Sequence, residues 1–400
     1  MNVNELFDPS RRRRLVLKRG RERAVANRHP WIFTGAIADE SGPAGAALAD
    51  LVDERGQVLA SGLYSPHSQI RLRALTFGDV PLTAELLRER ITAAIGRRKN
   101  LFDAATNAGR LLHAEGDDLS GLVVDRYNDV LVVEIANYGL EQLRPLLVET
   151  LKNAAAPRLI YFKNDLPARR LEQLTLESEW DGGGDPAATI SESSLRFVVE
   201  PAEGQKTGFF LDQRENRRLA RTLAGGARVL NLFSYSGAFG VYAAAGGASS
   251  VVNVDVSEKA IELARTNHEL NALSNNVTFV AADAFDYVRR RAAAGEAFDF
   301  VVCDPPAFAK SRGEVERAAR GYKDINLYAL RLVAPGGLLM TFSCSGHLSL
   351  DLFQKVIFSA AHDAGRQVSF VRRLTAAPDH PVSLYCPEGE YLKGFLLEVR

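Results

Sequence analysis

Between residues 228 and 374 the chain repeats one pattern, in which a short apolar run of strand length is followed by a longer stretch with helical spacing. The predicted strands are residues 228–233, 250–254, 277–281, 298–303, 337–343 and 367–374. Alternating strands and helices predict a parallel sheet wound by helices on both faces. Ligands bind beyond the carboxyl ends of the strands in such sheets, so the residues that follow each run are the candidates for function.

The first three predicted strands end in residues that suit a nucleoside-like ligand. The first runs into Phe233-Ser234-Tyr235-Ser236-Gly237-Ala238, where glycine permits a tight turn and close approach of a ligand to the backbone. The second ends in Asp255-Val256, where a carboxylate can accept hydrogen bonds from both ribose hydroxyls. The third runs into Asp283-Ala284, a second carboxylate that could bind an adenine amino group. Helix capping is the alternative role for Asp255.

The fourth and fifth predicted strands end in residues that can act on a substrate. Asp304-Pro305-Pro306-Ala307-Phe308 follows the fourth strand, and Ser343-Cys344-Ser345 ends the fifth. Acidic or nucleophilic residues therefore follow four successive strands, which favours a functional site over separate structural roles. Cys303 lies within a strand and is predicted to pack in the core, and Cys386 is given no role. The three cysteines show no metal-ligand spacing, so no metal is expected.

The order of these segments resembles that of the class I AdoMet-dependent methyltransferases. A nucleotide oxidoreductase would carry G-x-G-x-x-G in the first turn, and this turn lacks it. Residues 206–214 resemble the segment before the fold in the RlmI-type large-subunit rRNA cytosine-C5 methyltransferases, and that resemblance spans essentially the whole chain. It implies S-adenosyl-L-methionine as the cofactor. The residues expected to bind it are Phe233, Ser234, Gly237, Ala238, Asp255, Val256, Asp283, Ala284, Asp304, Asp212 and Arg214.

The resemblance also implies a mechanism. Carbon 5 of cytosine is a poor nucleophile, so a thiolate must first attack carbon 6, and Cys344 stands where the family keeps this nucleophile. Asp304 would steady the base electrostatically. Pro305, Pro306 and Phe308 would contact the substrate.

Two other interpretations stay open. An Asp-Pro-Pro loop with a nearby aromatic also marks enzymes that methylate exocyclic amines, so the chain could be a guanine N-methyltransferase in which Cys344 is incidental. It could also be an RNA-binding assembly factor without catalysis. The intact set of Gly237, Asp255, Asp283 and Asp304 argues against that last interpretation.

The N-terminal part has a different organisation. Short apolar runs at close spacing predict a small β domain, and His29-Pro30-Trp31-Ile32-Phe33 resembles part of the opening of a PUA domain, a compact RNA-binding barrel. The spacing then becomes helical over residues 82–101, and two more strands follow. The expected domains are a PUA-like RNA-binding domain at 1–75, a central α+β domain at 76–190 and a Rossmann-like methyltransferase domain at 191–400.

The zero net charge of the chain conceals an asymmetry. Residues 1–110 hold 18 Lys and Arg against 12 Asp and Glu, and eight of the basic residues lie between Arg11 and Arg23. Such a cluster suits contacts with phosphates, although a solvated basic arm explains it equally well. The residues expected to contact RNA are Arg12, Arg13, Lys18 and Arg19.

The sequence contains neither a secretory signal nor an uninterrupted apolar stretch of membrane-spanning length. A cytoplasmic location without membrane association is therefore expected. The resemblance implies large-subunit rRNA as the partner. The oligomeric state is not fixed by the sequence, and a homodimer is one state that it allows.

Overall fold

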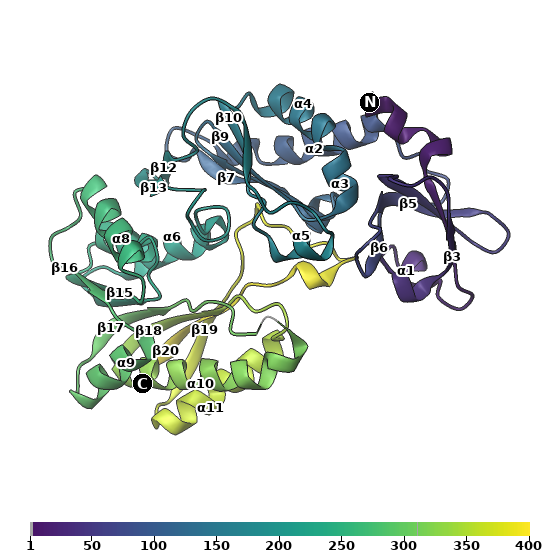
Figure 1. Cartoon of the computed structure of the whole chain (residues 1–400). Coiled ribbons are helices and arrows are strands. Elements are labelled where there is room, and N and C mark those ends of the chain that lie inside the picture. The colour runs from purple at the N-terminus through teal and green to yellow at the C-terminus, as the bar shows by residue number, and fades with distance from the viewer. Residues whose placement is uncertain (1–2, 310) are drawn as a thin grey trace. The chain divides into compact units, whose positions relative to one another are not determined.

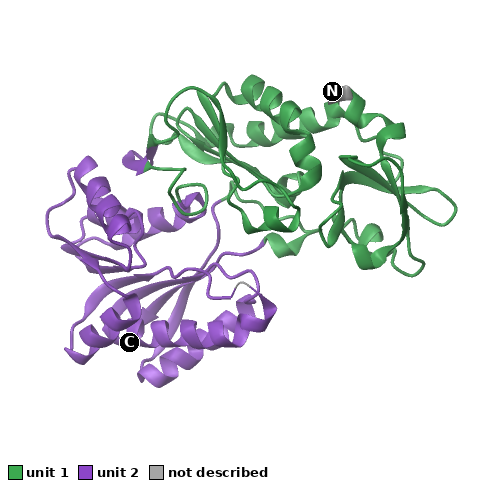
Figure 2. Ribbon diagram, in the orientation of Figure 1, with its two compact units in different colours: residues 1–189, 199–209, 378–389 green, residues 190–198, 210–377, 390–400 purple. Residues whose placement is uncertain are grey.

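The computed structural model describes residues 3–309 and 311–400, which form two compact units (Figures 1 and 2). The first unit contains residues 1–189, 199–209 and 378–389, and the second contains residues 190–198, 210–377 and 390–400. Two segments of the expected methyltransferase domain thus belong to the first unit, and the domain boundaries stay a prediction. None of the described helices combines the length and apolar character that crossing a membrane requires.

The first sheet of the first unit has six strands in the order β2-β6-β5-β4-β1-β3. Its alternating inward residues, such as Leu15, Leu51 and Leu72, are fully buried in one small core. Strand β3 was not predicted, because its sequence is mostly polar and exposed. The elements are β1 (Arg13–Leu17), α1 (Arg23–Ala26), β2 (Trp31–Phe33), β3 (Ile37–Ser41), β4 (Leu48–Val52), β5 (Val58–Tyr64) and β6 (Ile70–Phe77).

A second sheet of the first unit has the order β11-β10-β9-β8-β7, and helices α2 and α4 pack on it through a separate apolar cluster. The predicted helix and both predicted strands of this region are confirmed within a few residues. The elements are α2 (Ala84–Arg97), β7 (Ala108–His113), β8 (Leu122–Tyr127), β9 (Val130–Ile135), α3 (Tyr138–Gln142), α4 (Arg144–Ala155), β10 (Leu159–Phe162), α5 (Pro167–Leu171) and β11 (Glu179–Gly182), followed by the two-stranded sheet of β12 (Ala188–Glu192) and β13 (Leu195–Val199).

The second unit contains the predicted doubly wound sheet, in the order β16-β15-β14-β17-β18-β20-β19. All six predicted strands are present, and the four pairs from β16 to β18 are parallel. Strand β20 was not predicted, and it pairs antiparallel with both β18 and β19. The strands are β14 (Arg228–Leu232), β15 (Ser250–Asp255), β16 (Val277–Ala281), β17 (Phe298–Cys303), β18 (Val333–Ser343), β19 (Val368–Leu374) and β20 (Lys393–Val399).

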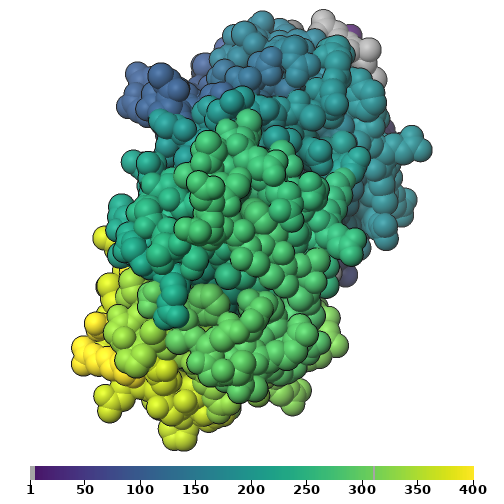
Figure 3. Space-filling model, turned by 90° about the vertical axis from the view of Figure 1, so that its left-hand side faces the viewer, coloured from purple at the N-terminus to yellow at the C-terminus, as the bar shows by residue number. Residues whose placement is uncertain are grey.

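Helices cover both faces of this sheet, because successive residues of its buried strands point to opposite sides. Val229 and Phe300 pack with α6 and α7, whereas Leu230 and Val301 pack with α9, α10 and α11. In the space-filling view, residues of this unit that are coloured green lie together on the face turned to the viewer (Figure 3). The helices are α6 (Arg214–Leu223), α7 (Ala238–Ala245), α8 (Glu258–Leu270), α9 (Ala284–Ala293), α10 (Val315–Leu332) and α11 (Leu350–Ala364).

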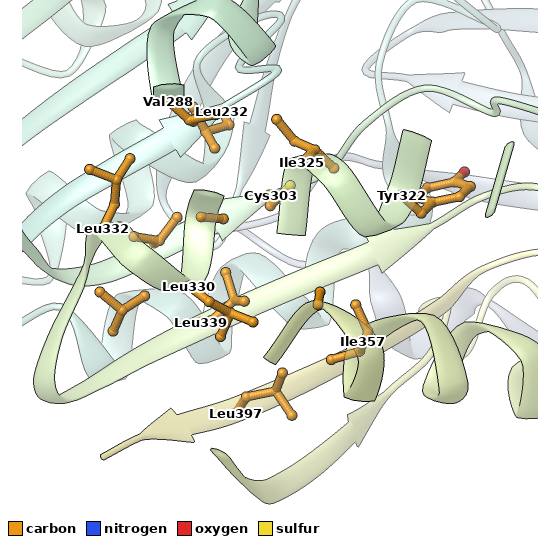
Figure 4. Packing of buried hydrophobic residues seen from close by; sticks show 14 of the residues in the cluster. Leu232, Val288, Cys303, Tyr322, Ile325, Leu330, Leu332, Leu339, Ile357 and Leu397 are labelled. Atoms are coloured by element: carbon orange, nitrogen blue, oxygen red, sulfur yellow. The ribbon is translucent and has the colours of Figure 1, made fainter. Parts of the chain in front are cut away.

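Cys303 lies where the sequence predicted it, inside the core. Its side chain is fully buried beside Ile325 of α10 (Figure 4). Burial raises the pKa of this thiol well above its ordinary value. A thiol held in its neutral form packs as a small apolar side chain, so Cys303 stabilises the sheet.

Candidate active site

The loop after β14 has an unusual backbone conformation. Phe233, Tyr235 and Gly237 all adopt positive φ angles, of 57°, 44° and 71°. Such angles are strained for residues other than glycine and occur often where a chain binds ligands. A Cβ atom on Gly237 would also lie 2.7 Å from the Cβ of Ala264 in α8, so only glycine fits there. The first strand end therefore forms the tight turn that the sequence predicted, and Ala238 begins α7 directly after it.

Asp255 connects this loop to the end of the second strand. Its carboxylate accepts hydrogen bonds from the backbone N–H of Tyr235, at 2.9 Å, and of Ser257, at 3.0 Å. Ser257 caps α8 by accepting a bond from the N–H of Ala260. The side chain of Asp255 is partly exposed, and the neighbouring Val256 is exposed. Asp255 thus shapes the loop, and its remaining lone pairs can accept further bonds.

Asp283 has the capping role that was considered for Asp255. One of its carboxylate oxygens accepts the N–H of Asp286 at 3.0 Å and so caps α9, in which Ala284 is the first, buried residue. Asp283 is exposed, so its other oxygen stays accessible. A helix cap and a ligand contact are compatible here, because a carboxylate can accept several hydrogen bonds at once.

Asp304 at the end of β17 is oriented by residues outside the sheet. The side-chain amide of Gln213 donates to Asp304 at 3.0 Å, and Asn216 donates to the other end of Gln213 at 2.6 Å. Asp212 accepts a bond from the hydroxyl of Tyr391 at 2.6 Å, and Arg214 is buried beside them. Gln213 was not predicted as a site residue, although it lies inside the 206–214 segment that the resemblance marked.

Cys344 lies beside the Asp-Pro-Pro loop. Its thiol donates to the carbonyl oxygen of Pro305, with the sulfur 3.7 Å from that oxygen. The parallel pairing of β17 with β18 causes this contact, because it carries both chain segments out of the sheet at the same edge. Cys344 is half-buried, whereas the flanking Ser343 and Ser345 are fully buried. The structure therefore brings the predicted nucleophile and the predicted substrate loop together.

The remaining substrate-loop residues are held by aromatic packing. The ring of Phe308 lies 4.6 Å from that of Tyr322 and 5.9 Å from that of Phe285, measured between centroids. The Tyr322 hydroxyl donates to the carbonyl of Pro306 and also bonds with Ser345. Tyr322 of α10 thus joins the loop of β17 to the turn after β18, a connection that the sequence did not indicate.

Comparison with known proteins agrees with this geometry. Residues 110–389 match the family model described as S-adenosylmethionine-dependent methyltransferase, and residues 15–77 match a PUA-like domain. The chain belongs to the S-adenosylmethionine-dependent methyltransferases. It is 43% identical over 393 residues to the ribosomal RNA large subunit methyltransferase I of Shewanella denitrificans, covering 96% of this chain and 99% of that relative.

Solved structures show the same fold. A SAM-dependent methyltransferase from Streptococcus mutans superposes with a TM-score of 0.81 at 23% identity, and covers 96% of this chain and 99% of its own. A methyltransferase complexed with SAH superposes with a TM-score of 0.83 at 22% identity and the same coverage. The predicted Rossmann-like methyltransferase fold with an N-terminal PUA-like domain is confirmed, and so is S-adenosylmethionine as the cofactor.

The strand-end residues of this methyltransferase fit such a cofactor. The Ser234 side-chain hydroxyl is buried, and within residues 3–309 and 311–400 it has no hydrogen-bond partner. A buried hydroxyl without a partner lowers the stability of a fold by about 1–3 kcal/mol. A ligand that forms this hydrogen bond would explain why a serine lies here. Ser234 lies in the strained loop next to Asp255, where a methionine-derived or ribose group would be held. The roles of the individual predicted residues stay a proposal.

The third cysteine of the methyltransferase lies in the first unit, close to His29 and Glu388, and the reactive atoms of the three residues lie within 4.8 Å of one another. The N–H of Trp31 donates to Nδ1 of His29, so the neutral ring carries its proton on Nε2, which faces Glu388 at 3.3 Å. Burial raises the pKa of Cys386 to about 12. Hydrogen bonds explain the contacts of His29 in this cluster without a metal ion.

The predicted RNA-contacting residues of the methyltransferase differ in how exposed their side chains are to solvent. Arg12 donates to Asp50, to the carbonyl of Phe7 and to that of Leu82, and its side chain is only 10% exposed. Arg13 donates to the carbonyl of Gly42 and packs over Tyr64.

Lys18 and Arg19, in contrast, are exposed, although the ammonium of Lys18 also donates to the carbonyl of Gly35 at 3.1 Å. Nearby lies a cavity of about 1130 Å³, whose lining includes the exposed Arg21, Arg23 and Arg28. Lys18 and Arg19, together with these three arginines, offer positive charge to solvent, whereas Arg12 and Arg13 mainly stabilise the domain.

Proposed function

We propose that this chain transfers the methyl group of S-adenosylmethionine to carbon 5 of a cytosine in large-subunit rRNA, with Cys344 as the nucleophile. The observation that carries the proposal is the 3.7 Å contact between the Cys344 sulfur and the carbonyl of Pro305, directly beside Asp304. The relative that is 43% identical bears the name of a large-subunit rRNA methyltransferase, which supports rRNA as the substrate class and with it a cytoplasmic location.

The three cysteines of the chain are not equivalent, which supports the choice of Cys344. Burial raises the thiol pKa of both Cys303 and Cys386, so their thiolates are disfavoured. Cys344 is the half-buried one, and it lies at the carboxyl edge of the sheet where ligands of such folds bind. A substrate base can therefore approach its sulfur.

In the proposed reaction the Cys344 thiolate adds to carbon 6 of the cytosine, and the ring electrons shift toward carbon 5. Asp304, oriented by Gln213, steadies the amino group and the ring nitrogen electrostatically while this charge develops, and itself gives up and gains no proton. The bound cofactor supplies an electrophilic methyl group on a sulfonium. Carbon 5 then loses its proton to solvent, the bond between carbon 6 and sulfur breaks, and Cys344 leaves as the thiolate. The net change is one proton released for each methyl transferred.

The cofactor would be held by the first three strand ends. Asp255 would accept from the ribose hydroxyls, Ser234 would donate to or accept from the amino-acid part, and Asp283 would bind the adenine amino group. Gly237 lets the backbone approach the ligand. The assignments of Asp255, Ser234 and Gly237 follow the geometry of the strained loop after β14.

RNA would be bound mainly through phosphates by the PUA-like domain. The exposed Lys18 and Arg19 are the predicted residues best placed for this role, because Arg12 and Arg13 are engaged within the domain. A homodimer stays an untested prediction.

Guanine N-methylation is the second candidate, because the Asp-Pro-Pro loop with Phe308 also suits an amino group. Against it, both Phe285 and Tyr322 already flank the ring of Phe308, which leaves less of its surface for stacking on a base. The assembly-factor interpretation is disfavoured by the intact set of Gly237, Asp255, Asp283 and Asp304 at the strand ends.

The proposal is tested by incubating the full chain with S-adenosylmethionine and undermethylated large-subunit rRNA, and by identifying the methylated nucleoside with mass spectrometry. We expect 5-methylcytidine, and the Cys386→Ala variant should form as much of it as the wild type. Methylated guanosine would instead establish the alternative enzyme. Absence of any methylated nucleoside, with free rRNA and with subunits, would establish the assembly factor.

A further inference from the structure

Lys393 is a buried cation next to the proposed nucleophile. It is the first residue of β20, and it pairs with Ser343 of β18, the residue before Cys344. Only 5% of Lys393 is exposed to solvent. A lysine ammonium is rarely buried to this extent unless other groups compensate for the lost water.

The ammonium of Lys393 binds the turn that follows Cys344. It donates to the carbonyl oxygens of Ser345, at 2.9 Å, and of Leu348, at 2.8 Å. Within the described part of the chain, no carboxylate lies within ion-pair distance of this ammonium. Two backbone carbonyls therefore replace water around a full positive charge, and in return they are fixed in position. The ammonium of Lys393 therefore fixes the turn that directly follows Cys344.

The charge of Lys393 is coupled to that of Cys344. Burial lowers the pKa of Lys393, and the negative charges of Glu390 and of an ionised Cys344 oppose this shift. Coupling of two charges is reciprocal, so an ammonium that a thiolate stabilises must stabilise that thiolate equally. Tyr322 from α10, whose own ionisation Cys344 disfavours, and the loop of Asp304 also face Cys344.

We propose that Lys393 is a positioning residue for Cys344: its ammonium fixes the Ser345–Leu348 turn and provides the positive charge beside which the Cys344 thiol ionises. This inference rests on the proposed function in that the thiolate matters for turnover only if Cys344 is the nucleophile. The ionisation of Cys344 itself can be measured without turnover, which separates the two.

The test measures the rate at which iodoacetamide alkylates Cys344 in the full chain as a function of pH, with the modified peptide identified by mass spectrometry. Lys393→Met removes the charge at similar length. We expect the midpoint of its pH profile to lie about one unit higher than that of the wild type, which means roughly tenfold less thiolate at a given lower pH. Lys393→Arg should keep the wild-type midpoint, and so should Lys355→Met, an exposed lysine of α11.

The folding of each variant is checked by thermal unfolding and by S-adenosylmethionine binding, since the cofactor residues lie at the first three strand ends. If Lys393→Met does not fold, Lys393→Gln keeps a hydrogen-bond donor without the charge and provides the same comparison. Equal midpoints in the wild type and a folded, uncharged variant would overturn the inference. That result would leave the proposed function intact, whereas full turnover in Cys344→Ala would end the proposed function and leave the alkylation result standing.

Discussion

Two regions of this chain carry predicted functional residues, the strand ends of the second unit and the basic segment from Arg11 to Arg23. At the strand ends, separate parts of the sequence converge, since Cys344 contacts Pro305 and Asp255 holds the loop of Tyr235. In the basic segment the neighbouring residues diverge: Arg12 and Arg13 are largely covered by contacts inside the domain, whereas Lys18, which donates to the carbonyl of Gly35, and Arg19 are exposed. Sheet topology dictates where residues meet, whereas local charge density does not say which way a side chain faces.

The largest effect that we expect concerns the basic segment. Replacing Arg12 with Ala removes the ion-pair partner of Asp50, which keeps the hydrogen bond from the hydroxyl of Ser61, and the donor to two backbone carbonyls, so the first unit should lose about 3 kcal/mol of stability. Denaturant unfolding measures this loss. The neighbouring Arg11, whose side chain is 48% exposed, is the control, and Arg11→Ala should change stability by less than about 0.5 kcal/mol. Equal stability of the two variants would show that the fold does not depend on Arg12, and Arg12 would again be a candidate for RNA binding.

At the strand ends, Asp255→Ala should weaken S-adenosylmethionine binding by about 2–3 kcal/mol, roughly 30- to 150-fold in Kd. The loss combines two ribose hydrogen bonds with the bonds that hold the loop of Tyr235 and the N–H of Ser257. Calorimetric titration measures the affinity. Asp351→Ala, which removes an exposed carboxylate from the first turn of α11, should leave the Kd unchanged. An unchanged Kd in Asp255→Ala would remove this residue from the site.

A smaller and cleaner effect is expected for Ser234→Ala. Its hydroxyl has no partner in the described chain, so the variant should unfold at the wild-type temperature or above it. Loss of one hydrogen bond to the cofactor costs about 1 kcal/mol, or roughly fivefold in Kd. The same titration, paired with thermal unfolding, checks both parts. Wild-type affinity would mean that the buried hydroxyl serves something other than the cofactor.

The smallest effect concerns the exposed half of the basic segment. Lys18→Ala with Arg19→Ala should flatten the dependence of RNA affinity on salt by a slope of about 1.4, because each phosphate contact to single-stranded RNA contributes about 0.7. Anisotropy titrations from low to high salt measure that slope. Arg55→Ala with Lys152→Ala removes two exposed charges elsewhere in the first unit and should leave the slope unchanged. If both pairs behave alike, Lys18 and Arg19 are merely solvated.

The sequence predicted what depends on local periodicity and on topology. The strands from β14 to β19, the glycine turn and the buried state of Cys303 all follow from short-range patterns. Strand β20 was missed because a short continuous apolar run does not distinguish strand from helix, and because it inserts between two earlier strands.

The sequence analysis missed Gln213 and Lys393 and misjudged Arg12 for another reason. The partner of Gln213 lies 91 residues away along the chain, that of Arg12 70 and that of Lys393 48. The local sequence pattern does not predict such distant contacts.

The central claim is that Cys344 forms a covalent bond with the substrate base. RNA that contains 5-fluorocytosine tests it, because fluorine cannot leave as the carbon-5 proton does and the enzyme stays attached. With S-adenosylmethionine present, we expect the wild type and Cys386→Ala to form an adduct that survives denaturing electrophoresis, and Cys344→Ala to form none while still binding the cofactor. An adduct in Cys344→Ala, or near-normal methylation by that variant, would contradict the account and make amino-group methylation the leading explanation of Asp304 and Phe308.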